Sequence, residues 1–236
     1  MQSHAKTMLT LLMMLCFCVA AQAQLKASLA QMPMYAESLE KGVLVDMVKA
    51  ISEASGKKIE IQVVPFKRSM DNVINRKVDF HAPLIVNPQN DEKTLNYDHS
   101  TEIIFHVNFC LYTNNAKPID IKKLKEYKIE TDAAHVPYFD FPIISSPDLE
   151  SSLKKVNAGR IDGFIFADQA SDPIIANLKL THVKKALYHV FDVRIILPKG
   201  EKGGATDKLL SAAIGKLRKS GKWVEIMGII DQPYKD

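Results

Sequence analysis

The chain has 236 residues, with 31 basic and 27 acidic residues, a formal net charge of +4 and 47% hydrophobic residues. Charges of both signs are interspersed along it, which is typical of a soluble surface and argues against a nucleic-acid interface. Beyond residue 23 the only cysteine is Cys110, so we expect no internal disulfide.

The first 23 residues have the pattern of a secretory signal peptide. Lys6 precedes an apolar run over about residues 8–20, too short for a membrane span, and Ala21-Gln22-Ala23 supplies the small residues of a cleavage site. We therefore expect cleavage after Ala23 and an exported, periplasmic chain without membrane insertion. Loss of Lys6 lowers the net charge to about +3.

Strands and helices alternate over the first part of the mature chain. Apolar residues recur at strand or helix spacing, and Gly56 supplies a helix stop. We predict strands over 25–33, 58–66 and 78–86, and helices over 43–56 and 67–77. This order implies parallel pairing with right-handed crossovers. Ligands bind at the carboxyl ends of such strands, so residues 33–35, 65–68 and 81–86 should meet at one edge.

From about Thr113 the pattern restarts. We predict strands over 128–131 and 160–168, and helices over 146–159 and 205–221. Residues 73–80 ("VINRKVDF") and 156–163 ("VNAGRIDG") both read as a helix end, a basic residue, a β-branched residue and Asp before a strand. This echo indicates two similar α/β lobes, and Asp79 and Asp162 should be turn or capping residues.

These segments, in this order, resemble the family 3 extracytoplasmic solute-binding proteins of ABC importers. The similarity spans nearly the whole mature chain. It rests on the Pro33/Tyr35 loop, "GVLVDMVKAISEASGKKIEI", "PFKRSMDNVINRKVD", "GRIDGFIFAD" and "LPKGEKG…LLSAAIGKLRKSGKWVEIMGII".

The resemblance implies the two-lobed type II periplasmic-binding-protein fold, an α/β fold in which each lobe is a mostly parallel sheet flanked by helices. Lobe 1 would comprise residues 24–110 plus 192–236, and lobe 2 residues 111–191. Two crossover segments, near Asn108–Asn114 and Tyr188–Ile195, would join them, with the ligand in the cleft between them. The implied partners are a small-molecule ligand and a permease or a sensor, and we expect a monomer.

The first lobe offers six candidate ligand contacts. Arg68 could clamp a carboxylate, or could be a surface residue on the first turn of a helix. Phe66 and Tyr35 could form an apolar wall of the cleft, or could pack in the core. The remaining candidates, His81, Pro83 and Lys93, lie in the strand over 78–86 and in the loop after it.

The second lobe offers three candidates. The resemblance implies that Asp168, at the end of "RIDGFIFAD", holds a ligand ammonium group; alternatively it caps a helix that begins at Gln169. Its strand is one residue longer than is usual in the family, which would turn the side chain to the other face. Asp132 and His135 follow the strand over 128–131 and could face the cleft.

The sequence departs from the amino-acid binders of this family at two points. Ala82, Pro83 and Leu84 replace their hydroxyl-bearing residues, and Lys93 stands near the place of their carboxylate-binding Arg. Lysine lacks the planar fork of arginine. A Gly-Ser/Thr-Thr turn of the second lobe is also absent. We therefore expect a small polar solute, amino-acid-like or related, that is not a standard α-amino acid.

Other classes of function lack a motif in this sequence. The histidines have no metal-ligand spacing, so we expect no metal and no cofactor. There is no serine-centred elbow, phosphate-binding loop or metalloprotease motif, so we expect no enzyme. The alternative to importer delivery is a ligand-sensing or dehydratase-like periplasmic protein of the same fold.

Overall fold

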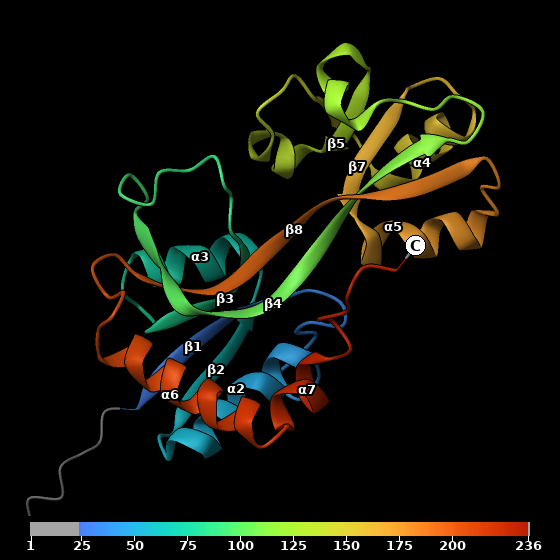
Figure 1. Cartoon of the computed structure of the whole chain (residues 1–236). Coiled ribbons are helices and arrows are strands. Elements are labelled where there is room, and N and C mark those ends of the chain that lie inside the picture. The colour runs from blue at the N-terminus through green and yellow to red at the C-terminus, as the bar shows by residue number, and fades with distance from the viewer. Residues whose placement is uncertain (1–23, 236) are drawn as a thin grey trace, which may run out of the picture.

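The computed structural model describes residues 24–235, so the predicted signal peptide lies outside the described residues. Eight strands form one sheet, in the order β2-β1-β3-β8-β4-β7-β5-β6. Two long strands, β4 and β8, run through both ends of the molecule, and the other elements gather into a half on each side (Figure 1). No helix within residues 24–235 is long and apolar enough to cross a membrane.

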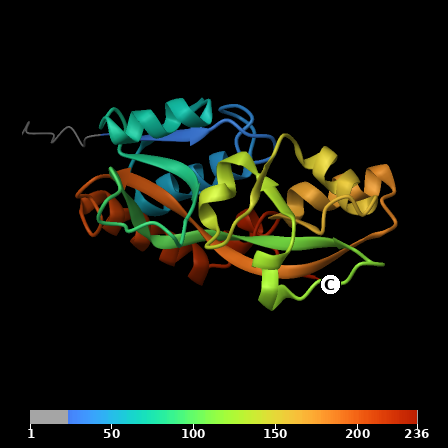
Figure 2. The same cartoon turned by 90° about the horizontal axis from the view of Figure 1, so that it is seen from above.

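The first half contains the predicted alternation of strands and helices. Strand β1 pairs in parallel with both β2 and β3, as the element order predicted. Figure 2 shows β1 pointing toward the second half, so its carboxyl end faces that side. The elements are β1 (Leu25–Ala30), α2 (Val43–Ser55), β2 (Ile59–Val64), α3 (Phe66–Ile74) and β3 (Phe80–Ile85).

The second half repeats the arrangement on a smaller scale. Strand β5 pairs in parallel with β6 and with β7. The sequence predicted β5, α4 and β7, offered a helix from Gln169 only as an alternative role for Asp168, and gave no prediction for β6. The elements are the 3₁₀ segments η1 (Ile121–Glu126) and η2 (Ala133–Tyr138), the strands β5 (Ile129–Asp132), β6 (Ile144–Ser146) and β7 (Gly163–Ala167), and the helices α4 (Leu149–Asn157) and α5 (Asp168–Leu178).

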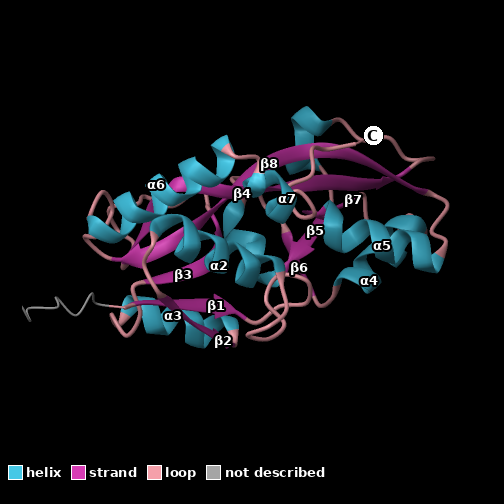
Figure 3. Cartoon of the chain, turned by 90° about the horizontal axis from the view of Figure 1, so that it is seen from below, coloured by secondary structure: helices cyan, strands magenta, loops and turns pink. Residues whose placement is uncertain are grey.

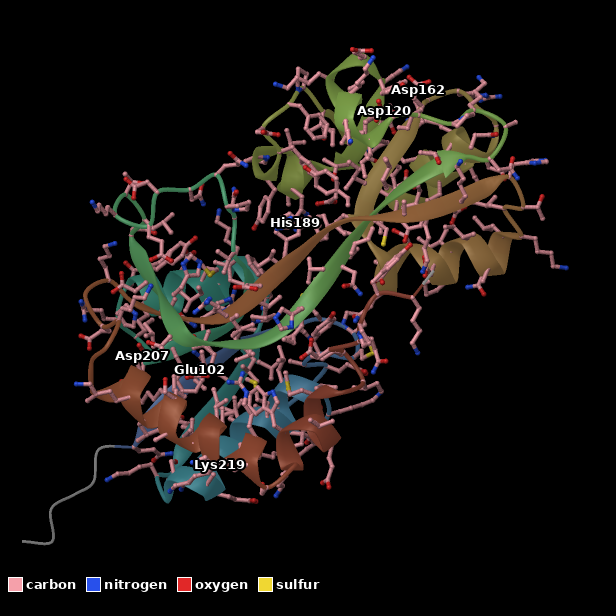
Figure 4. The ribbon with its side chains drawn as sticks, viewed as in Figure 1. Glu102, Asp120, Asp162, His189, Asp207 and Lys219 are labelled. Atoms are coloured by element: carbon pink, nitrogen blue, oxygen red, sulfur yellow. The ribbon has the colours of Figure 1, made fainter. Side chains whose placement is uncertain are left out.

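The echo in the sequence corresponds to one repeated structural device. Asp79 Oδ2 accepts a hydrogen bond from the Lys26 backbone N–H at 2.7 Å, and Asp162 Oδ2 accepts one from the Lys128 backbone N–H at 2.8 Å. Each aspartate thus fixes the entry of its own strand against the neighbouring strand, β1 or β5. Figure 4 shows Asp162 in the second half. The sequence predicted turn or capping roles for both residues, and the structure shows this bond to a neighbouring strand.

Strands β4 (Tyr97–Asn114) and β8 (Val183–Pro198) are antiparallel partners from Tyr97↔Pro198 to Asn114↔Val183. Phe109 pairs with His189 and Cys110 with Leu187, so β8 carries one extra residue, Tyr188, at this bulge. Figure 4 shows His189 on the stretch of β8 between the halves. Strand β8 pairs with β3 in the first half, whereas β4 pairs with β7 in the second.

The C-terminal helices return to the first half. Helices α6 (Ala205–Lys219) and α7 (Lys222–Met227) pack against α2, and Figure 3 shows the three on one face of the sheet. Leu210, Ile214 and Trp223 belong to the main hydrophobic core, which also includes Ile129 and Ile165 of the second half. Apolar packing is therefore continuous between the halves.

The packing of α6 gives a stability prediction. Ile214 is fully buried in the core, whereas Val224 on α7 is 70% exposed. We expect Ile214→Ala to lower the free energy of unfolding by about 2–4 kcal/mol, because it removes buried methyl groups and leaves a cavity. The control, Val224→Ala, should change it by no more than about 0.5 kcal/mol. Urea unfolding measures both, and equal effects would contradict the assignment of α6 to the core.

Candidate ligand-binding site

The loop after β1 holds Tyr35 in a fixed position. The backbone N–H groups of Val43 and Leu44, at the start of α2, donate to the carbonyls of Met34 and Tyr35 at 3.1 and 2.8 Å. Gly42 adopts φ 138°, and a Cβ there would overlap the Tyr35 carbonyl oxygen. The half-buried Tyr35 ring lies 5.8 Å from that of Phe105. Backbone contacts thus present this side chain at the carboxyl edge of β1.

The start of α3 places Phe66 and Arg68 at the same edge. Phe66 follows Pro65 at the end of β2 and is 43% exposed, with its ring edge-on to His81 at 5.6 Å. Arg68 is exposed in the first turn, and its side chain makes no hydrogen bond or ion pair within residues 24–235. Its guanidinium therefore keeps all its donors for an external partner.

His81 and Pro83 are buried behind this edge. Nδ1 of His81 lies 2.6 Å from Ser69 Oγ, which is 2.9 Å from Ser28 Oγ, and Nε2 lies 3.2 Å from the Pro83 carbonyl oxygen. Burial lowers the pKa of His81 to about 4, so the ring is neutral at pH 7. Nε2 faces a carbonyl, and Nδ1 faces the Ser69 hydroxyl, which itself donates to Ser28 Oγ. Both ring nitrogens are thus used inside the protein.

The loop after β3 carries Lys93. Its side chain is exposed and makes no hydrogen bond or ion pair within residues 24–235. The neighbouring Glu92 accepts from Lys202 Nζ at 2.9 Å, and its carbonyl accepts from Lys199 Nζ at 2.9 Å. At the start of the loop, Asn87 Nδ2 donates to the Pro137 carbonyl of the second half at 3.2 Å. The loop is therefore tied to both halves while Lys93 stays available.

In the second half, Asp132 and His135 form a pair. Asp132 Oδ1 lies 3.0 Å from His135 Nδ1 and accepts a hydrogen bond from the Ala134 backbone N–H at 3.0 Å. The His135 ring lies 5.0–5.4 Å from the rings of Tyr138, Phe166 and Phe109, and its side chain is 18% exposed. The carboxylate fixes the orientation of the ring and leaves Nε2 for a further contact.

Asp168 is the first residue of α5, directly after β7. Its Oδ2 accepts a hydrogen bond from Asn108 Nδ2 at 3.1 Å, and its Oδ1 accepts one from the Gln169 backbone N–H at 2.7 Å. The alternative of an N-cap before a helix beginning at Gln169 is wrong, because α5 starts at Asp168 and its N-cap residue is Ala167. Burial and the Asp168 charge both raise the pKa of Tyr35. Tyr35 also bonds to Gln169, the residue that follows Asp168, at 3.0 Å.

Several hydrogen bonds join the halves beside these residues. Tyr35 Oη donates to Gln169 Oε1 at 3.0 Å, Tyr138 Oη donates to the Ile85 carbonyl at 3.1 Å, and Asn87 donates to Pro137 as described above. Burial, with a smaller contribution from Tyr97, raises the pKa of Tyr138 to about 12, so its hydroxyl stays a donor at neutral pH. These hydrogen bonds hold the carboxyl edge of the strands in the first half next to the carboxyl edge of the strands in the second half.

The structure groups some of the nine predicted residues and separates others. Tyr35 bonds to the neighbour of Asp168, Phe66 contacts His81, and Asp132 contacts His135, whereas the side chains of Arg68 and Lys93 make no hydrogen bond or ion pair within residues 24–235. Ligand contact by any of the nine stays a prediction. Within residues 24–235 no group of three or more His, Cys, Asp or Glu side chains could hold a metal ion.

Sequence reasoning missed several polar residues of this region. Asn108 on β4, Gln169 on α5 and Tyr138 on η2 all make contacts that organise the site. Their partners are distant in the sequence, and isolated Asn, Gln and Tyr residues carry no spacing signal. The one available clue was the position of Gln169, directly after the predicted strand end at Asp168.

The comparisons with known proteins agree with this geometry. The profile of the bacterial extracellular solute-binding proteins, family 3, matches residues 26–228, and the chain therefore belongs to this family. A search of curated protein sequences gave no significant match.

Several solved structures share the fold. The GluR0 ligand-binding core from Nostoc punctiforme, in complex with L-glutamate, is 17% identical, with a TM-score of 0.62 over 88% of this chain and 100% of that chain. ArtJ from Geobacillus stearothermophilus, an arginine-, lysine- and histidine-binding protein, is 16% identical, with a TM-score of 0.61 over 90% and 97%. A histidine kinase sensor domain with similarity to periplasmic binding proteins is 16% identical, with a TM-score of 0.62 over 88% and 96%. At these identities the likeness shows the fold, and the expected type II periplasmic-binding-protein architecture is confirmed.

The buried His81 gives a prediction of pH dependence. Its pKa is about 4 in the folded protein against 6.5 for an ordinary histidine, so between these two pH values the unfolded chain binds the extra proton. The resulting stability is present above pH 6.5 and is lost as the pH falls toward 4, by about 3 kcal/mol. Urea unfolding from pH 7 to pH 4 should show a smaller loss of stability for His81→Gln than for the wild type. Parallel curves would contradict the neutral, buried state of this histidine.

Proposed function

We propose that this family 3 protein captures a small polar solute between its two halves and releases it to an ABC importer after export to the periplasm. In this proposal lobe 1 comprises residues 24–110 plus 192–236, and lobe 2 residues 111–191. Strands β4 and β8 are the connections about which the lobes open and close. The protein works as a monomer and does not transform its ligand.

The observation that carries the proposal is the contact between Tyr35 and the first turn of α5, which begins at Asp168, beside the β4–β8 pair. Each residue lies at the carboxyl edge of its own set of parallel strands, where α/β sheets bind ligands. Tyr35 reaches the first turn of α5 through its hydrogen bond to Gln169 at 3.0 Å. A solute at this junction would contact both halves at once, as closure around a ligand requires.

The polar groups at the junction favour a solute with an acidic group. Arg68 and Lys93 are cations without an ion pair in residues 24–235. Asp132 and Asp168, in contrast, already accept hydrogen bonds from His135 and from Asn108. An arginine can bind a carboxylate through two parallel hydrogen bonds, which we assign to Arg68. Asp168 then orients a donor group of the same solute.

The remaining predicted residues have supporting roles in this proposal. Phe66 and Tyr35 form the apolar walls, and His135 offers its Nε2. His81 and Pro83 are buried, and we infer that they support the edge from behind without touching the solute, since both His81 nitrogens have internal partners. Hydroxyl groups are absent from β3 at Ala82 and Pro83, so the solute need not be a standard α-amino acid.

Ligand sensing is the second candidate function. The fold is shared with a histidine kinase sensor domain and with a receptor's ligand-binding core, as well as with binding proteins of transport systems. The same capture of a solute by closure would serve either output. A turnover assay with product detection tests the remaining dehydratase-like alternative, because a binding protein leaves its ligand unchanged.

Substitution of two residues tests the proposed site. A thermal-shift screen against amino acids, polyamines, organic acids and metal ions first identifies a solute. We then expect Arg68→Ala and Asp168→Ala each to weaken its binding at least tenfold, about 1.4 kcal/mol, in isothermal titration calorimetry. The protein should stay folded, because Arg68 is exposed and Asp168 is half-buried.

The matched control is Arg160→Ala, which removes an exposed arginine near the opposite, amino end of β7. It should leave the affinity unchanged. If Arg68→Ala and Asp168→Ala also bind with wild-type affinity, the proposed site is wrong.

A further inference from the structure

Gln169 is hydrogen-bonded at both ends of its side-chain amide. Its Oε1 accepts from Tyr35 Oη of the first half at 3.0 Å, and its Nε2 donates to the Ile230 carbonyl at 2.6 Å. Gln169 itself lies in the first turn of α5, in the second half. One side chain therefore connects three segments that are far apart in the sequence. The amide accepts through its oxygen and donates through its nitrogen, so it can hold both partners at once.

The segment that follows α7, which carries the Ile230 carbonyl, is held in place by burial and by hydrogen bonds. Ile230 is fully buried in the main core. Asp231 Oδ1 accepts a hydrogen bond from the His106 backbone N–H at 2.9 Å and lies 3.0 Å from His106 Nδ1. The Gln232 carbonyl accepts from Asn108 Nδ2 at 3.0 Å. The carbonyl that Gln169 contacts is thus fixed to the core and to β4.

The same segment continues into the second half. Tyr234 packs against the smaller core, which contains Cys110, Tyr112 and Phe164, and Lys185 Nζ lies 5.4 Å from the centre of its ring. Figure 1 shows the C-terminal end of the chain beside α5. Residues 230–234 therefore form a third connection between the halves, in addition to β4 and β8.

Opening would break both side-chain hydrogen bonds of Gln169, because Tyr35 and Ile230 belong to the first half and Gln169 to the second. Tyr35 belongs to the loop that α2 holds in the first half, whereas Gln169 moves with α5. Burial and the nearby Asp168 charge raise the pKa of Tyr35, so the hydroxyl remains a donor at neutral pH. Asn108 bridges Asp168 and Gln232 next to this contact, at 3.1 and 3.0 Å. The hydrogen bonds of Gln169 and Asn108 thus also fix the positions of Tyr35 and Asp168, two residues of the proposed site.

We propose that Gln169 is a positioning residue that latches the two halves in the closed arrangement, through its bonds to Tyr35 and to Ile230. By setting the fraction of closed molecules, the latch sets the affinity for the solute without contacting it. The latch rests on the proposed function in one respect, namely that the halves open to admit a solute.

Distance measurements on the protein without any solute test the latch. Spin labels attached after Glu60→Cys and Glu150→Cys lie on exposed positions of the first and second halves. The native Cys110 is fully buried, and burial raises its pKa to about 12, so it stays unlabelled. Double electron–electron resonance then reports the distribution of distances between the halves in the full mature chain.

We expect Tyr35→Phe to raise the population of longer distances about fivefold, as expected for the loss of one hydrogen bond, and Gln169→Leu, which removes two, to raise it by at least as much. The double variant should match Gln169→Leu, because that substitution already removes the contact with Tyr35. Gln169→Glu keeps an acceptor for Tyr35 but cannot donate to Ile230, so it should have a smaller effect than Gln169→Leu. Circular dichroism confirms that each variant is folded.

Unchanged distributions in both single variants, or effects that add in the double variant, would overturn the latch. The result is independent of the identity of the solute. If the variants behave as expected and no solute of the screen binds, the proposed function fails while the latch stands. If Arg68→Ala and Asp168→Ala weaken binding but the distances never change, the proposed function stands and the latch fails.

Discussion

The antiparallel pairing of β4 and β8 is the constraint on which the rest of the structure depends. The two strands pair from Tyr97↔Pro198 to Asn114↔Val183, and each lends its other edge to a different half, β8 to β3 and β4 to β7. The pair therefore connects the two halves, and in the proposed function they move relative to one another by bending it. A bulge at Tyr188 interrupts the regular pairing of these strands.

The arrangement of charge follows from this geometry. Asp132 and Asp168 stand at strand ends in the second half and are satisfied from within, whereas Arg68 and Lys93 belong to the first half and have no ion pair in residues 24–235. In the proposed function, closure brings the unpaired side chains of Arg68 and Lys93 toward the carboxylates of Asp132 and Asp168, which already accept hydrogen bonds. An acidic solute at the junction would accept hydrogen bonds from Arg68 and Lys93, and these bonds would supply its affinity.

The sequence alone predicted the parallel strands and their ligand edge, since apolar periodicity and element order depend on local spacing. The repeated aspartates, Asp79 and Asp162, were also visible, because each lies at a fixed offset from its strand. The two side-chain hydrogen bonds of Gln169 were not predictable, since its partners lie in the Tyr35 loop and in the C-terminal segment. The burial of His81 was missed for a similar reason. Its partners Ser28 and Ser69 come from two other elements, and only the folded sheet brings them together.

A crystal structure of the mature chain with the tightest-binding solute of the screen tests the central claim most directly. We predict density for the solute between the halves, with its acidic group on the Arg68 guanidinium and with contacts to Tyr35 and Asp168. Density on the outer surface of either half, or a solute at the junction that leaves Arg68 without a partner, would contradict the account.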